Sequence, residues 1–277
     1  MDLAAGLKSE LRALGVKSSD LIMVHASLRK LGLAKSRLKS DLGVTCGADL
    51  LVDVIDDAVG PDGTWMMVLG SEYAQDWVNY RPVEERAGLL AGTEPFEAAA
   101  APAMKEVGFL AEAFRRRAGT LLSANPSGRF GARGARAAEL LQGQPWNDYY
   151  GPGSPLEKLA HWGGKVLRLG ADPETVTILH YAEYLADLPA KRRTRWDYLL
   201  ATAEGPKQVW VECLDDLNGI ADFAGEDYFA AIVGAYLAEG RAQAGPVGAA
   251  QAELLDAADL VAFGVRWMAA NLQPASG

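Results

Sequence analysis

Histidine and cysteine are scarce in this chain of 277 residues, which contains three histidines and two cysteines. Cys46 and Cys213 are far apart and form no C-x-x-C pair. The sequence therefore predicts neither a disulfide framework nor a zinc-ribbon site. Such cysteine usage suits a reducing compartment, so we expect a cytoplasmic protein.

Long apolar runs and basic clusters are also missing. No stretch approaches the ~20 apolar residues of a membrane span, and residues 1–8 show no basic region followed by an apolar one. The formal net charge of −9 argues against a nucleic-acid partner, because binding to phosphates depends on basic residues. The sequence predicts no membrane and no nucleic-acid contact, and its acidity favours small cationic ligands.

Several familiar enzyme signatures are absent. The chain has no G-x-S-x-G elbow, no Walker loop, no G-x-G-x-x-G and no H-E-x-x-H. Their absence disfavours a serine hydrolase, a nucleotide hydrolase, a Rossmann dehydrogenase and a zincin.

Helical and strand patterns alternate along the chain. Helices are expected at 3–14, 50–59, 107–118, 134–142, 154–163, 173–187, 226–238 and 256–271, and strands at 21–24, 64–69, 165–169, 194–200 and 207–213. The last two strands should form a β-hairpin around the turn at 204–206. The order predicts one α/β domain over 1–277, with a mixed, mostly parallel central sheet flanked by helices and the hairpin added to it.

The segment at about 71–106 interrupts this alternation. It lacks periodicity and carries prolines at 82, 95 and 102 among charged and aromatic residues. Long irregular segments within a domain are usually functional, so we predict a lid-like insert.

Each of the three histidines sits in a different setting. His161 lies near the end of a predicted helix, where an imidazole can have a structural role. His25 follows a buried strand, at the sheet edge where ligands of α/β proteins gather. His180 shares one helix face with Thr177 and Glu183, and a face this polar favours a functional site over simple packing.

A histidine base needs a carboxylate to fix its tautomer. Glu183, Asp215 and Asp216 are the candidates, since the last two follow the strand at 207–213. A solvated Asp-Asp turn is the alternative interpretation of that pair.

Six ordered segments resemble the aminoglycoside 3-N-acetyltransferases. They are VHASLRKLG at 24–32, VGPDGT at 59–64, YGPGSPL at 150–156, GGKVL at 163–167, TILHYAE at 177–183 and KRR at 191–193. The match covers almost the whole chain. It implies direct acetyl transfer from acetyl-coenzyme A to the 3-amino group of an aminoglycoside antibiotic, which confers resistance. It also implies a fold distinct from the common acetyltransferase fold, a monomer or homodimer, and no metal.

The resemblance also implies roles for individual residues. His180 matches the catalytic base and Asp215 the acidic partner, with its register against Asp216 open by one residue. The expected coenzyme contacts are His25, Ala26, Ser27, Leu28, Arg29, Gly32 and Thr177. The expected antibiotic contacts are Glu72, Tyr73, Asp76, Asp148, Tyr150 and Glu183.

Three further expectations concern single features. Backbone N–H groups at 26–29 should stabilise the oxyanion, and Arg29 or the basic run at 191–193 should meet coenzyme phosphates. Asn125 stands where many members carry histidine before Pro126. Two other functions stay open, a metal-dependent hydrolase using His25, His180 and Asp215, and a non-catalytic binder of cationic aminosugars.

Overall fold

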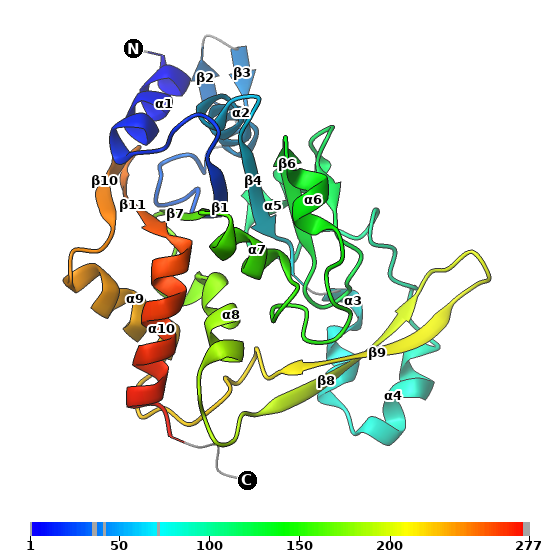
Figure 1. Cartoon of the computed structure of the whole chain (residues 1–277). Coiled ribbons are helices and arrows are strands. Elements are labelled where there is room, and N and C mark those ends of the chain that lie inside the picture. The colour runs from blue at the N-terminus through cyan, green and yellow to red at the C-terminus, as the bar shows by residue number, and fades with distance from the viewer. Residues whose placement is uncertain (1, 35–37, 41–42, 71–72, 274–277) are drawn as a thin grey trace.

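A seven-stranded mixed sheet forms the centre of the computed structural model, which describes residues 2–34, 38–40, 43–70 and 73–273 (Figure 1). The strand order is β10-β11-β7-β1-β4-β6-β5. Their bounds are β1 (Leu21–Ala26), β4 (Thr64–Val68), β5 (Leu121–Leu122), β6 (Phe130–Gly134), β7 (Lys165–Leu169), β10 (Gln243–Val247) and β11 (Ala250–Asp256).

Alternating side chains of the central strands divide the core into two layers. Leu21 and Met23 of β1 join one apolar cluster, whereas Ile22 and Val24 join the other, because successive side chains of a strand point to opposite faces. One face is covered by α1 (Leu3–Leu14), α2 (Gly47–Val59) and α5 (Phe109–Arg116). The other is covered by α6 (Ala137–Leu141), α7 (Pro155–His161), α8 (Ile178–Leu185), α9 (Tyr228–Ala238) and α10 (Ala257–Asn271).

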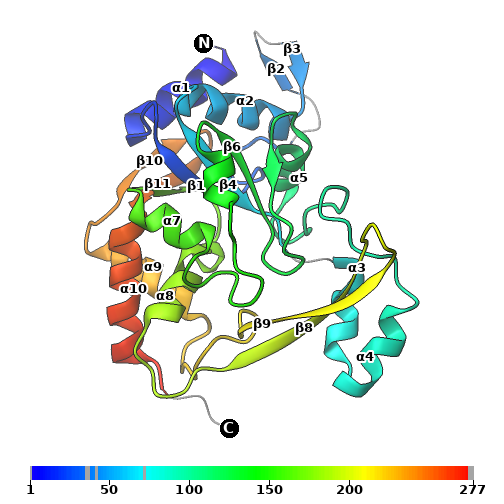
Figure 2. The same cartoon turned by 45° about the vertical axis from the view of Figure 1, so that its right-hand side comes forward.

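A second unit, the hairpin of β8 (Arg193–Leu200) and β9 (Lys207–Leu214), extends beside the insert (Figures 1 and 2). The insert contains α3 (Tyr73–Asp76), the 3-10 helix η1 (Trp77–Tyr80) and α4 (Val83–Leu90). Gln75 fixes it to the hairpin, since its side chain donates to Leu199 O at 2.9 Å and accepts from Leu199 N at 2.7 Å. Arg86 adds an ion pair with Asp197 at 3.0 Å. A short separate hairpin joins β2 (Leu38–Ser40) and β3 (Gly43–Thr45).

The predicted α/β architecture is confirmed: a mixed sheet flanked by helices, with an added hairpin. The expected predominance of parallel pairs is wrong in detail, because only the two pairings of β1 are parallel and the other four in the described sheet are antiparallel. The sequence patterns missed β5, β6, β10 and β11 of this sheet, and all four of these strands pair antiparallel.

Two local expectations also differ from the structure. The helix expected at 173–187 is divided into the 3-10 helix η2 (Pro173–Thr175) and α8, because Val176 adopts a non-helical backbone with ψ of 81°. The insert, expected to be irregular, forms three short helical pieces. Among the described helices, none combines the length and apolar character that crossing a membrane requires.

Candidate active site

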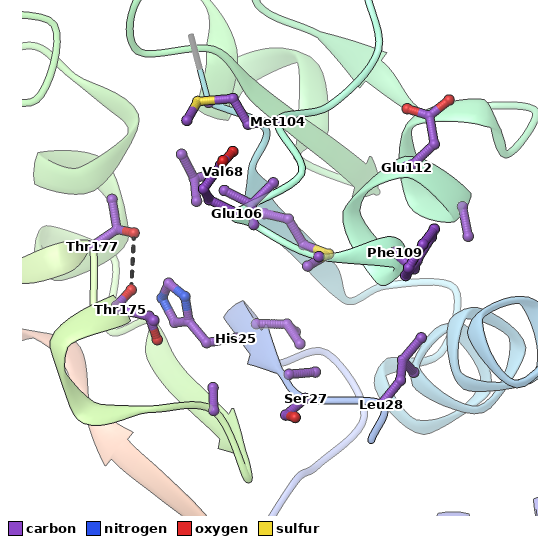
Figure 3. Close-up of a pocket in the computed structure, with 18 of the residues that line it drawn as sticks. His25, Ser27, Leu28, Val68, Met104, Glu106, Phe109, Glu112, Thr175 and Thr177 are labelled. Atoms are coloured by element: carbon purple, nitrogen blue, oxygen red, sulfur yellow. Dashed lines mark hydrogen bonds between the residues drawn. The ribbon is translucent and has the colours of Figure 1, made fainter. Parts of the chain in front are cut away.

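A cavity of about 1310 Å³ lies at the carboxyl ends of the adjacent strands β1 and β4. His25 reaches it from β1 and Val68 from β4, whereas Thr177 and His180 approach from the start of α8. In Figure 3, His25 and Thr177 lie on one side, and Phe109 and Glu112 lie on the other. The cavity therefore joins segments that are more than 100 residues apart in sequence.

His180 is the most constrained side chain of this cavity. Its Nδ1 lies 2.7 Å from Oε2 of Glu183, and its ring stacks on Tyr150 at 4.9 Å with an 11° interplanar angle. Phe229 closes another side with an edge contact at 4.8 Å. With Nδ1 occupied and the side chain 19% exposed, Nε2 is the nitrogen left to act on a ligand.

Glu183 is buried beside His180 and is not among the residues that line the cavity. Its side chain is 1% exposed, and its second oxygen accepts a hydrogen bond from the Tyr228 hydroxyl. Burial alone would lower the pKa of His180, but the charge and hydrogen bond of Glu183 outweigh it, so the pKa is raised. The structure places Glu183, which was expected to contact the antibiotic, outside the cavity lining and against the imidazole of His180.

Asp215 does not contact His180, contrary to the expected pairing. Its Oδ1 accepts from the backbone N–H groups of Leu217 and Asn218 at 3.1 and 2.9 Å, so its carboxylate holds the turn after β9. The next residue, Asp216, lines the cavity together with His180. The carboxylate that pairs with His180 is that of Glu183, and of the two aspartates only Asp216 lines the cavity, because the turn directs the two carboxylates differently.

Most of the expected coenzyme segment lines the cavity. Residues 25–29 and Thr177 are among its walls, but Gly32, at the end of the turn after β1, is not. His25 is 6% exposed, and burial, aided by the Arg168 charge, lowers its pKa to about 4. Its Nε2 has no hydrogen-bond partner within the described chain. His25 is therefore neutral near pH 7.

Two exposed arginines, Arg29 and Arg116, line the cavity wall. Neither of them forms an ion pair within the described residues. The basic run at 191–193 is used elsewhere: Lys191 donates to Tyr184 O, Arg192 pairs with Asp222 and Arg193 pairs with Asp148. It lies outside the cavity lining. Of the two expected phosphate contacts, only Arg29 lines the cavity, and it is joined there by Arg116, which the sequence patterns did not indicate.

The expected antibiotic contacts divide into three groups. Asp76 and Tyr150 line the cavity. Asp148 does not, because its carboxylate pairs with Arg193 at 2.8 Å. Glu72 lies outside the described residues, and Tyr73 begins α3 while its side chain lies outside the described part.

The sequence patterns did not indicate four further residues of the cavity wall near Asp76 and Asp216. These are Tyr80, Trp196, Tyr198 and Leu217. Trp196 and Tyr198 share one face of β8, and period-two alternation in the predicted hairpin was the available signal. Nothing local marked Tyr80 or Leu217.

Asn125 organises the loop that precedes β6. Its side-chain oxygen accepts from the N–H groups of Ser127 and Gly128 at 3.0 Å each, and its amide donates to Trp146 O at 2.8 Å. Asn125 is 5% exposed and does not line the cavity, whereas Ser127 does. Its role is to place Ser127.

No group of three His, Cys, Asp or Glu side chains that could hold a metal ion occurs in the part of the chain that the structure describes. Asp215, needed for the hydrolase alternative, is committed to its turn. That hypothesis therefore lacks its ligand set.

Known proteins resemble the chain over nearly its full length. The family model described as aminoglycoside 3-N-acetyltransferase matches residues 23–269. Aminoglycoside N(3)-acetyltransferase VII of Streptomyces paromomycinus is 34% identical over 96% of this chain and 91% of its own. Aminoglycoside N(3)-acetyltransferase III of Pseudomonas aeruginosa is 35% identical over 95% and 92%.

Solved structures agree with these relatives. AAC-IIIb in a binary complex with CoASH superposes with a TM-score of 0.85 at 36% identity, covering 99% of this chain and 98% of that one. AAC-VIa bound to sisomicin gives a TM-score of 0.84 at 33% identity, covering 96% and 97%. The chain therefore belongs to the aminoglycoside 3-N-acetyltransferase family of acyltransferase enzymes.

Proposed function

We propose that this enzyme transfers the acetyl group of acetyl-coenzyme A to the 3-amino group of an aminoglycoside, with His180 as the general base, and thereby confers resistance. The observation that carries the proposal is that the buried His180–Glu183 pair opens into the same cavity as the segment at 25–29. Relatives with CoASH or sisomicin bound support the two ligand classes.

The base is needed because an aminoglycoside amine is mostly protonated near neutral pH and cannot attack a thioester in that form. Nε2 of His180 removes a proton, while Glu183 stabilises the imidazolium through Nδ1. The neutral amine nitrogen then bonds to the acetyl carbon, and the carbon–sulfur bond breaks. The leaving thiolate takes the first proton from His180, and the second proton, which the nitrogen loses as the amide forms, passes to His180 and from there to solvent.

The turn after β1 supplies donors for the oxyanion. The Ser27 N–H is already bonded to Leu169 O at 3.0 Å. The N–H groups of Leu28 and Arg29 make no hydrogen bond within the described residues, so we assign the oxyanion to them.

The coenzyme extends along the wall toward α5. Arg29 and Arg116 bind its phosphates by charge-assisted hydrogen bonds. Phe109, which is 84% exposed on this wall, stacks on the adenine. In this proposal the enzyme works as a monomer or a homodimer.

The antibiotic occupies the end formed by the hairpin and the insert. Asp76 and Asp216 hold ammonium groups, and Tyr80 and Trp196 pack on sugar faces and cations. In this proposal the whole chain is one acetyltransferase domain working in the cytoplasm, and the insert at 71–106 is its antibiotic-side wall and lid.

A thiol-release assay with acetyl-coenzyme A and a panel of aminoglycosides tests the proposal, with mass spectrometry and NMR to locate the acetyl group. We expect a product acetylated at the 3-amino nitrogen, and a rate at least ~10²-fold lower for His180→Ala with an unchanged circular dichroism spectrum. Tight antibiotic binding without thiol release would instead identify a non-catalytic binder.

A further inference from the structure

A chain of hydroxyl groups ends at the carboxylate of Asp216. The Tyr198 hydroxyl donates to Ser127 Oγ at 3.2 Å, Ser127 donates to Tyr149 Oη at 3.0 Å, and Tyr149 donates to Asp216 Oδ2 at 2.5 Å. The Cys213 thiol adds a longer contact to Tyr149 Oη at 3.4 Å. Every hydroxyl donates in the same direction, toward the carboxylate.

Tyr149 is hidden behind the cavity wall. It is 1% exposed and absent from the lining, whereas Ser127, Tyr198 and Asp216 all line the cavity. Tyr149 therefore does not touch a ligand, and any influence it has must pass through Asp216.

The surroundings of Tyr149 are shaped to hold this hydroxyl in place. A Cβ at Gly128 would come within 2.0 Å of the Tyr149 ring, so only glycine leaves room for it. Asn125 fixes that same loop by accepting from the Ser127 and Gly128 N–H groups. The contact to Asp216 has the length of a charge-assisted O–H···O⁻ hydrogen bond, which is stronger than a neutral one.

We propose that Tyr149 is a positioning residue that keeps Asp216 ionised and aimed at the substrate ammonium group, with Ser127 and Tyr198 reinforcing its hydrogen bond. The inference rests on the proposed function, since it assigns Asp216 to the amine. Without this donor, a carboxylate in the wall would become protonated more readily and would bind the cation less well.

Several other titratable groups interact electrostatically with the Asp216 carboxylate. Burial raises the pKa of Asp216, while the charge of His180 and the hydrogen bond from Tyr149 oppose that rise. The remaining groups coupled to Asp216 are Glu183 on α8, Asp215 beside it, Tyr198 on β8, Cys213 on β9, and Tyr150. A variant that changes only the Tyr149 hydroxyl leaves all of these in place.

The test is an NMR titration of enzyme labelled with ¹³Cγ-aspartate, in which the Asp216 signal is identified by its loss in Asp216→Asn. In Tyr149→Phe we expect the midpoint of that signal to rise by roughly one pH unit. Tyr236→Phe is the matched control, because it removes an equally buried hydroxyl that donates to another carboxylate, Asp259, at 2.8 Å. Its Asp216 midpoint should stay unchanged.

Kinetics give an independent readout. For Tyr149→Phe, KM for the aminoglycoside should rise by about 10-fold at pH values where Asp216 becomes protonated, and should return toward the parent value as pH increases. The kcat of the variant should change by less than about 3-fold. An equal loss at every pH, with KM unchanged, would indicate a structural role and overturn the inference.

Replacement of Tyr149 by 3-fluorotyrosine covers the case in which the phenylalanine variant does not fold. The more acidic phenol is a stronger donor, so the Asp216 midpoint should fall by roughly a few tenths of a pH unit. An unchanged midpoint in the variants that fold contradicts the proposed role of Tyr149. Absence of acetylation by the parent enzyme contradicts the proposed function, while the titration still decides the role of Tyr149.

Discussion

Nδ1 of His180 lies 2.7 Å from Oε2 of Glu183, a carboxylate three residues further along the same helix. Both residues belong to α8, so their relative position is set by the helix and does not depend on a distant strand or loop. The Tyr228 hydroxyl fixes the other carboxylate oxygen from α9. The imidazole is thus oriented before any ligand enters the cavity.

Glu183→Gln tests this relationship. The amide can present an N–H to Nδ1, which favours the wrong tautomer, so we expect kcat to fall ~10²–10⁴-fold with little change in KM. The raised pKa of His180 should place the acidic limb of kcat above pH 6.5, because the base must be neutral to act. In Glu183→Gln the residual activity should have its limb at lower pH. A kcat within 3-fold of the parent would remove Glu183 from this role.

Asp215→Asn and Asp216→Asn form a matched pair. Asparagine at 215 can still accept from the N–H groups of the turn, so activity should change by less than about 3-fold. At 216 the substitution removes the charge that faces the substrate, and kcat/KM for the aminoglycoside should fall ~10²-fold. Steady-state kinetics at several aminoglycoside concentrations distinguish the two. A larger loss of activity in Asp215→Asn than in Asp216→Asn would mean that the turn directs the Asp215 carboxylate into the cavity.

Arg29→Ala and Arg116→Ala should each raise KM for acetyl-coenzyme A by about 3–10-fold, since each removes one charge from the proposed phosphate site. The effect should shrink as ionic strength increases. Arg266→Ala on α10, outside the cavity lining, is the control and should leave KM unchanged. If KM for acetyl-coenzyme A in Arg29→Ala and Arg116→Ala equalled that of the Arg266→Ala control, the phosphates would bind elsewhere.

His25→Gln should change how stability depends on pH. The unfolded chain protonates this residue near its ordinary pKa of 6.5, whereas the folded protein keeps it neutral down to about 4. Its contribution to folding is therefore present above pH 6.5, declines as pH falls through this window, and is lost below about 4. Between pH 7 and pH 5 the parent should lose about 2 kcal/mol more unfolding free energy than the variant. Urea unfolding without ligands measures the difference, and parallel pH curves would contradict it.

Features that depend on nearby residues could be predicted from the sequence. The continuous apolar run from Leu21 to Val24 predicts a strand buried on both faces, and the i, i+3 spacing of His180 and Glu183 places them on one helix face. The hairpin at 193–214 follows from two alternating runs around a Gly-Pro turn.

Contacts between distant segments were decided only by the tertiary structure. The direction of strand pairing in the sheet depended on strands such as β10, at its edge, and the neighbouring β11, which the sequence patterns did not reveal. A turn that engages the Asp215 carboxylate decided that Asp216 lines the cavity and Asp215 does not. Ion pairs formed across the chain hold the basic run at 191–193 outside the cavity lining. Sequence spacing fixes which side chains share an element, but only packing determines which of them face a common cavity and which find partners elsewhere.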